Sequence, residues 1–326
     1  MGKGPVGKKH VIDQINLDEI KYDTTIMLIG PRESGKTTAA KAIIRRINHR
    51  FAYGVLFSKS AKVSGDWKGW FPSTHVFPQL DEEQLRLIIR QQERLKRISR
   101  REGKADFPRV LILMDDVIDS GTRFNKTLSE VFTNGRHYNI TIITIMHYIM
   151  TLDPTMRTNC AHFFFFALPN LIPDIHEKYA KTAFTYEAFE RVFKKCTVNQ
   201  GAFVVNALGH RDPYHTRSVY KYFQVAHEMN PDEFHEPCRV GGESFWRWAT
   251  KNRRGKKRDE SSSDDDEDED DEEEEEDDDG YGVRLVKRKR KRQPDPEPES
   301  DGEDEEEEEE VESQALKRRR ARAGAR

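Results

Sequence analysis

Short apolar runs alternate with segments of helical periodicity from residue 24 to about residue 206. A run of roughly four to eight apolar residues is typical of a buried strand, and apolar residues spaced three or four positions apart are typical of an amphipathic helix. The alternation predicts an α/β fold with a mostly parallel sheet flanked by helices. Strands are expected at Thr24–Ile29, Tyr53–Ser58, Val110–Met114, Ile140–Met146, His162–Ala167 and Ala202–Asn206, and helices at Lys36–Asn48, from Asp81 onward, and at Thr127–Thr133, Pro173–Lys181 and Tyr186–Cys196.

The helical pattern that begins at Asp81 is the longest in the chain and is rich in cations. Its inner face is expected to consist of Leu85, Ile88, Ile89, Leu95 and Ile98, and its outer face of Arg86, Arg90, Arg94, Lys96, Arg97, Arg100 and Arg101. Such a face suits the phosphate backbone of nucleic acid, which it can bind without reading bases. A solvated helix surface is the alternative.

Charge divides the chain near Thr250. Residues 1–250 contain 36 Lys and Arg against 27 Asp and Glu, whereas residues 251–326 contain 19 against 31, so a formal net charge of −3 hides a basic part and an acidic part. Blocks of like charge cannot collapse into a core. We therefore expect a flexible basic arm at residues 1–19, a folded domain at 20–250 and a disordered acidic and basic tail at 251–326.

The tail suggests partners of its own. Acidic runs at Asp264–Asp279 and Glu303–Glu310 could mimic DNA, fold back on the basic domain, or bind basic viral or histone proteins, although they could equally be solubilising. Basic clusters at Lys287–Arg292 and Lys317–Arg320 look like nuclear-import signals. No apolar stretch approaches the roughly 18 residues of a transmembrane helix, so we expect no membrane insertion. The three cysteines and the four tryptophans are expected to pack.

A phosphate-binding motif follows the first expected strand. Gly30–Thr37 reads GPRESGKT, which fits the P-loop pattern G-x-x-x-x-G-K-[ST] between a strand and a helix. Glycines let the backbone curl so that its N–H groups face a phosphate, Lys36 can reach the β- and γ-phosphates of ATP, and the Thr37 hydroxyl can hold Mg²⁺. The nucleotide-binding residues expected here are Gly30, Pro31, Arg32, Glu33, Ser34, Gly35, Lys36, Thr37 and Thr38.

An acidic pair ends the third expected strand, as a nucleotide-hydrolysing P-loop domain requires. Asp115 follows five apolar residues and is expected to hold Mg²⁺ at the carboxyl end of the sheet. Asp116 follows on the opposite side of the pleat, where it could orient or deprotonate the attacking water. An acidic loop that caps the next helix is the alternative for both residues.

The spacing of the motifs also predicts a strand order. The strand at Ile140–Met146 should lie between the P-loop strand and the Asp115 strand, as in ATP-driven motors rather than nucleotide kinases. A polar residue at the tip of the inserted strand can sense the γ-phosphate, and here that residue is His147. An ordinary hydrogen-bonding histidine is the alternative.

Motors of this type usually act as rings in which an arginine of one subunit completes the site of the next. Arg136, in the turn before the inserted strand, and Arg157, which follows that strand, are the candidates. For each residue, a surface or DNA-facing charge is the alternative.

Four segments together resemble a known family. Gly30–Thr37, Leu111–Asp116, Gly135–Thr141 and Met156–Asn159 occur in the order seen in poxvirus-type genome-packaging ATPases of large double-stranded DNA viruses, within the FtsK/HerA class of P-loop NTPases. The resemblance covers about residues 20–210. The family usually has Gln where this chain has His147.

The resemblance implies an ATP- and Mg²⁺-dependent motor that moves double-stranded DNA into a viral capsid as a homo-oligomeric ring, with capsid or portal-type proteins as partners. Packaging would occur in the host nucleus or a cytoplasmic viral factory, and the protein could be bound to the virion. A nucleotide or nucleoside kinase and a non-catalytic DNA- or chromatin-binding P-loop protein are the alternatives. The kinase lacks support because no arginine-rich lid segment is evident.

Overall fold

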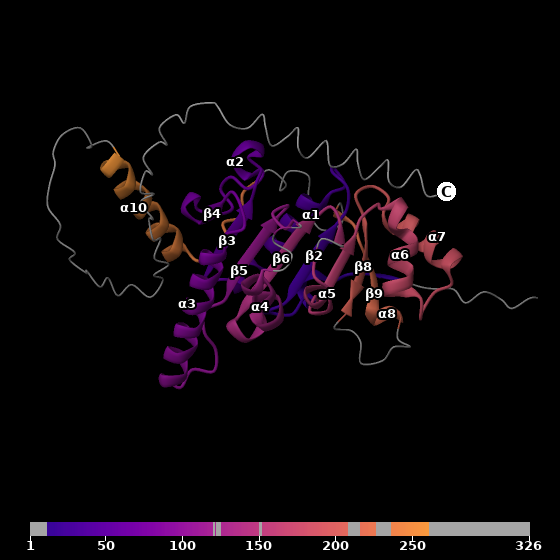
Figure 1. The fold of residues 1–326 in the computed structure, drawn as a ribbon, viewed down its shortest axis with the longest axis horizontal. Helices are drawn as coiled ribbons and strands as arrows, with labels where there is room; N and C mark the ends of the chain where they lie inside the picture. The colour runs from indigo at the N-terminus through magenta and orange to yellow at the C-terminus, as the bar shows by residue number, and fades with distance from the viewer. Residues whose placement is uncertain are drawn as a thin grey trace, which may run out of the picture. The chain divides into compact units, whose positions relative to one another are not determined.

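The computed structural model describes residues 12–119, 121, 125–149, 152–207, 216–225 and 236–260 (Figure 1). These residues belong to one compact unit, Met1–Val283. The expected arm at 1–19 is therefore described only from Ile12, and the acidic runs and basic clusters of the tail lie outside the described residues. None of the helices within the described ranges has the length and apolar character needed to cross a membrane.

A nine-stranded sheet in the order β1-β9-β8-β7-β2-β6-β5-β3-β4 organises the described chain, and Figure 1 shows the strands following one another across the molecule. Pairing is parallel except that β8 is antiparallel to both of its neighbours. The strands are β1 (Asp13–Gln14), β2 (Thr25–Ile29), β3 (Tyr53–Ser58), β4 (Val76–Phe77), β5 (Val110–Asp115), β6 (Ile140–Met146), β7 (His162–Phe165), β8 (Ala202–Asn206) and β9 (Tyr220–Phe223).

Helices cover both faces of this sheet. They are α1 (Lys36–Ile47), α2 (Ala61–Ser64), α3 (Glu82–Arg101), α4 (Lys126–Asn134), α5 (Pro154–Thr158), α6 (Ile172–Ile175), α7 (Tyr186–Cys196), α8 (Thr216–Val219) and α10 (Glu243–Glu260). Short 3₁₀ turns include η3 (Ser73–His75) and η4 (Gly135–Tyr138), and α6 continues into a π-helical turn at His176–Ala180. The predicted mostly parallel α/β architecture is confirmed.

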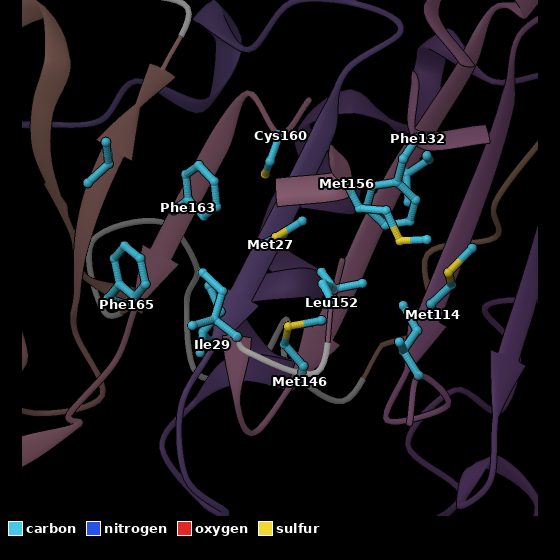
Figure 2. Packing of buried hydrophobic residues seen from close by; sticks show 14 of the residues in the cluster. Met27, Ile29, Met114, Phe132, Met146, Leu152, Met156, Cys160, Phe163 and Phe165 are labelled. Carbon is cyan, nitrogen blue, oxygen red and sulfur yellow. The ribbon is translucent and has the colours of Figure 1, made fainter. Parts of the chain in front are cut away.

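Each central strand is apolar on both faces because each face is covered. In β2, Met27 and Ile29 belong to the core that α3 to α7 share, whereas Ile26 and Leu28 belong to the core under α1. Figure 2 shows the first core, where Met27 and Met146 from the strands lie near Met156 and Leu152. Successive side chains of a strand point to opposite faces, so the near-continuous apolar runs in the sequence follow from this two-sided burial.

The long helix α3 begins as expected and ends differently. Asp81 caps its amino terminus by accepting hydrogen bonds from the backbone N–H groups of Glu83 and Gln84. Ile98, expected on the inner face, is 37% exposed, while Gln92 and Ser99 are buried. The Ser99 hydroxyl donates to the carbonyl of Asp106, so the last turns pack through polar contacts on the chain that returns to β5. The inner-face prediction is wrong at Ile98 for that reason.

Two features lie beyond what periodicity predicted. The strands β1 and β4 have two residues each, too few for a recognisable pattern, and the apolar run of β9 is interrupted by Lys221. The helix α10 runs through Thr250, the boundary expected between domain and tail, and its Phe245 is buried against Tyr53 with ring centroids 5.9 Å apart. Ordered helix therefore extends ten residues past that expected boundary, to Glu260.

Candidate active site

Three neighbouring parallel strands bring the expected site residues to one edge of the sheet. Ile29 of β2 is in register with Met146 of β6, and Asp115 of β5 is in register with Ile145. The P-loop follows β2 and His147 follows β6 directly, while Asp115 ends β5 and Asp116 follows it. The insertion of β6 between β2 and β5 confirms the predicted strand order, and the carboxyl edge is where ligands of open α/β sheets bind.

The backbone of the P-loop has the shape of a phosphate cradle. Glu33 and Gly35 have φ values of +60° and +94°, and the Ser34 hydroxyl donates to the carbonyl of Pro31 at 2.9 Å. A Cβ atom at Gly30 would lie 2.7 Å from the Cβ atom of Phe166. The first N–H groups of α1 have no intrahelical acceptors and lie at the positive end of the helix dipole. The loop therefore fits the phosphates of a nucleotide such as ATP.

Pro31, Arg32 and Glu33 are exposed on the outside of the loop, whereas Ser34, Gly35, Thr37 and Thr38 are half-buried. Lys36 is 6% exposed, and its ammonium group donates to the carbonyl of Pro31 across the loop. Burial lowers the pKa of Lys36 to about 8, although Asp115 and Asp116 oppose this shift. An anionic phosphate beside Lys36 would favour the charged form.

Asp115 is a buried carboxylate held by two donors. It is 8% exposed, and its Oδ2 accepts from the Trp67 indole N–H at 2.9 Å and from the Ser58 hydroxyl at 3.4 Å. Burial raises the pKa of Asp115 above its ordinary value, while these two hydrogen bonds lower it. Alternation along β5 places Asp115 with Leu111 and Leu113 on the face that α1 covers. A carboxylate and a threonine hydroxyl are hard oxygen ligands, so Asp115 and Thr37 fit Mg²⁺.

Asp116 and His147 form a contact at the rim of this site. Asp116 leaves the strand in a left-handed conformation, with φ +52°, and its backbone N–H donates to the carbonyl of Ile145. His147 Nε2 lies 3.7 Å from Asp116 Oδ2, and His147 Nδ1 lies 3.1 Å from the carbonyl oxygen of Gly30. A carbonyl only accepts, so Nδ1 carries the proton. His147 thus joins the first glycine of the P-loop to Asp116, a contact that also suits a sensor.

Arg136 and Arg157 do not lie with these residues. Arg136 is exposed in η4, directly before β6, and Arg157 is half-buried in α5, which precedes β7. Both strands run parallel to β2, so both arginines lie toward the amino edge of the sheet. The seven residues of β6 alone span about 23 Å. Neither arginine can therefore complete the P-loop of its own subunit in this arrangement.

Sequence reasoning missed two contacts of the site. Trp67 was expected only to pack, and it also donates to Asp115; the available signal was that a buried indole N–H needs an acceptor, but no spacing links residues 48 positions apart. Gln200, with φ +59° in the loop before β8, has its Cβ atom 2.8 Å from where a Gly35 side chain would begin. The other tryptophans pack as expected, and Trp246 donates its indole N–H to the carbonyl of Val240.

Comparison with known proteins shows several that are similar to this chain. The family model described as the poxvirus A32 protein matches residues 14–175. An uncharacterised protein of frog virus 3 (isolate Goorha), 015R, is 30% identical over 149 residues, which cover 45% of each chain. Protein L437 of Acanthamoeba polyphaga mimivirus, also uncharacterised, is 23% identical over 205 residues, or 61% of this chain and 72% of the relative.

Among the solved structures that match this chain is the genome-packaging NTPase B204 of Sulfolobus turreted icosahedral virus 2 in complex with ATPγS. It is 15% identical, with a TM-score of 0.43, and the match covers 63% of this chain and 98% of B204.

Proposed function

Over residues 14–175 the chain belongs to the poxvirus A32 protein family, and from this premise we propose that it is an ATP-hydrolysing motor that packages viral double-stranded DNA. The observation that carries the proposal is the site at the carboxyl edge. There a P-loop lysine, a buried strand-end aspartate and a histidine from the inserted strand converge on one position. The strand order supports a motor and gives no support to the kinase alternative.

The residues of the site have separate tasks in hydrolysis. The P-loop N–H groups and Lys36 bind the β- and γ-phosphates of ATP and stabilise charge that develops on them. Thr37 and Asp115 would hold Mg²⁺, which supplies charge neutralisation between the phosphates. Asp116 accepts a proton from, or orients, the attacking water. His147 donates through Nδ1 to Gly30 and so can transmit the state of the γ-phosphate to Asp116.

A ring of identical subunits explains the position of the arginines. Arg136 and Arg157 lie toward the edge opposite their own P-loop, where a neighbouring subunit could receive them. An arginine supplied in this way stabilises transition-state charge. We propose that one of them acts on the neighbour's ATP.

Duplex DNA is the proposed cargo. The exposed cations of α3, among them Arg90 and Arg97, suit a phosphate backbone contacted without base readout. Capsid or portal-type proteins are proposed as further partners, and a viral factory or the virion as the place of action. The proposed interactions of the acidic tail and a nuclear location rest on residues outside the described part of the chain.

ATPase rate with and without duplex DNA, measured beside native mass, tests this function. We expect an oligomer whose hydrolysis is stimulated by DNA of any sequence. Phosphoryl transfer to a nucleotide acceptor without DNA stimulation would favour the kinase alternative, and absence of ATP binding would favour a non-catalytic DNA-binding protein.

A further inference from the structure

We infer that Trp67 is a positioning residue of the ATPase site, which holds the Asp115 carboxylate in the orientation that Mg²⁺ binding needs. The inference rests on the proposed function, because Asp115 is the Mg²⁺-side carboxylate in that proposal.

The hydrogen bond from Trp67 is specific in its geometry. Trp67 Nε1 donates to Asp115 Oδ2 at 2.9 Å, an ordinary length for a strong N–H···O bond to a carboxylate. The Ser58 hydroxyl reaches the same oxygen at 3.4 Å and itself accepts from the backbone N–H of Ala61. With both donors on Oδ2, the carboxylate cannot rotate freely, and Oδ1 is the oxygen available to Mg²⁺ or its water. Outer partners of this kind orient metal ligands.

The indole is itself fixed between elements. Trp67 is 2% exposed, and its ring meets Trp70 and Phe71 edge-on with centroids 5.9 and 6.2 Å apart. The ammonium group of Lys41, one turn beyond Thr37 on α1, lies 5.7 Å from the Trp67 ring centroid. Trp67 therefore contacts both the helix that carries Thr37 and the strand that carries Asp115. A rigid donor with few rotatable bonds suits this task better than a flexible one.

A tryptophan of similar burial that does not reach the carboxylate is available as a control. Trp70 is also 2% exposed and lies under Lys41 and Arg45, at 5.9 and 5.3 Å from its ring centroid. Within the described part of the chain, no hydrogen bond joins Trp70 to Asp115. Trp67→Phe and Trp70→Phe thus remove similar volume from one aromatic cluster, and only the first removes the donor to Oδ2.

The test compares these two variants in the full chain. Trp67→Phe should raise the Mg²⁺ concentration for half-maximal ATP hydrolysis about tenfold. Its affinity for ATPγS without Mg²⁺, measured by calorimetry, and its Tm should equal those of Trp70→Phe. An unchanged Mg²⁺ requirement, or an equal loss of affinity with and without Mg²⁺, would overturn the inference and leave the proposed ATPase intact. An unsubstituted chain without Mg²⁺-dependent nucleotide binding would overturn the proposed function itself and the inference with it.

A measurement on the unsubstituted chain covers the case in which Trp67→Phe does not fold. With ¹⁵N-labelled tryptophan, Mg²⁺ added to the ATPγS complex should shift the Trp67 indole N–H signal more than those of Trp70, Trp246 and Trp248. Equal shifts at all four indoles, or none at Trp67, would contradict a role at the metal site.

Discussion

At the carboxyl edge of the sheet Lys36 and Asp115 are buried and held by named contacts, whereas at the amino edge Arg136 and Arg157 lie at or near the surface. Lys36 and Asp115 are 6% and 8% exposed at the first edge, while Arg136 is exposed at the second. Buried charge is costly unless it is paired or used, so the burial of Lys36 and Asp115 beside the P-loop is typical of a functional site. Charge at the surface can contact a second molecule. We therefore expect the first edge to carry the reaction of a subunit and the second edge to face a neighbouring subunit.

The largest effect is expected at the carboxyl edge. Lys36→Ala removes the charge that reaches the phosphates, so ATP hydrolysis should fall below detection while far-ultraviolet circular dichroism stays unchanged. Lys62→Ala, on the exposed side of α2, is the matched control and should retain full activity. Undiminished turnover in Lys36→Ala would remove the basis for calling this edge the active site.

The second prediction asks whether the amino edge acts across subunits. Arg136→Ala or Arg157→Ala, depending on which arginine faces the neighbouring ATP, should lower the hydrolysis rate about 10³-fold. Each site would then take Lys36 from one subunit and the arginine from the next. Mixing the arginine variant with Lys36→Ala should therefore restore hydrolysis at the sites that receive both residues intact. Arg191→Ala, on the exposed side of α7, is a control. Activity that is lost by neither arginine variant, or that mixing does not restore, would contradict action in trans.

The two edges also differ in how much of their structure could be predicted from the sequence. Gly30–Thr37 and the apolar run before Asp115 are local patterns, so the P-loop, the strand order and the acidic pair were all predicted and the fold was confirmed. The Trp67–Asp115 bond joins residues that only the fold brings together, and η4 and α5 lie at the amino edge because β6 and β7 are parallel to β2. Ile98 shows the same limit within one helix, since periodicity cannot tell where the underlying sheet ends.

A smaller effect is expected where His147 joins the P-loop to Asp116. His147→Ala removes the donor to the Gly30 carbonyl and should lower kcat about 10²-fold with little change in ATP affinity. His147→Gln keeps an N–H donor and should retain most of the activity, which is the measurement that separates hydrogen bonding from imidazole chemistry. If the Gln variant is as slow as the Ala variant, the imidazole itself is required.

Acidification is expected to lower the free energy of unfolding through His162, at the amino edge of the sheet. His162 begins β7 there, neither of its ring nitrogens has a hydrogen-bond partner among the described residues, and burial lowers its pKa to about 4. Between pH 6.5 and pH 4 the unfolded chain binds a proton that the folded chain does not, so the free energy of unfolding falls as pH falls through this window. Lowering the pH from 7 to 5 should cost about 2 kcal/mol at this residue.

Urea unfolding of His162→Leu at pH 7 and at pH 5 measures how much of the stability loss on acidification is due to His162. The fall in the free energy of unfolding between pH 7 and pH 5 should shrink by roughly half in this variant. The other half remains because burial also lowers the pKa of His75 to about 4, and His75 is still present. An unchanged acid loss would show that His162 is not the sensitive group of the amino edge.

The mildest expected effect concerns the exposed cations of α3 and their proposed DNA contacts. Removing two phosphate contacts should reduce the slope of log affinity against log salt by about 2, since each contact releases roughly one counterion. Arg90→Ala with Arg97→Ala should therefore weaken duplex binding equally for all sequences and leave DNA-free ATP hydrolysis unchanged. Arg191→Ala with Lys195→Ala, two exposed cations of α7, removes the same net charge elsewhere. A specific DNA-binding surface loses contacts only when its own cations are removed. An equal change of slope in both double variants would therefore mean that net charge, rather than the α3 surface, attracts DNA.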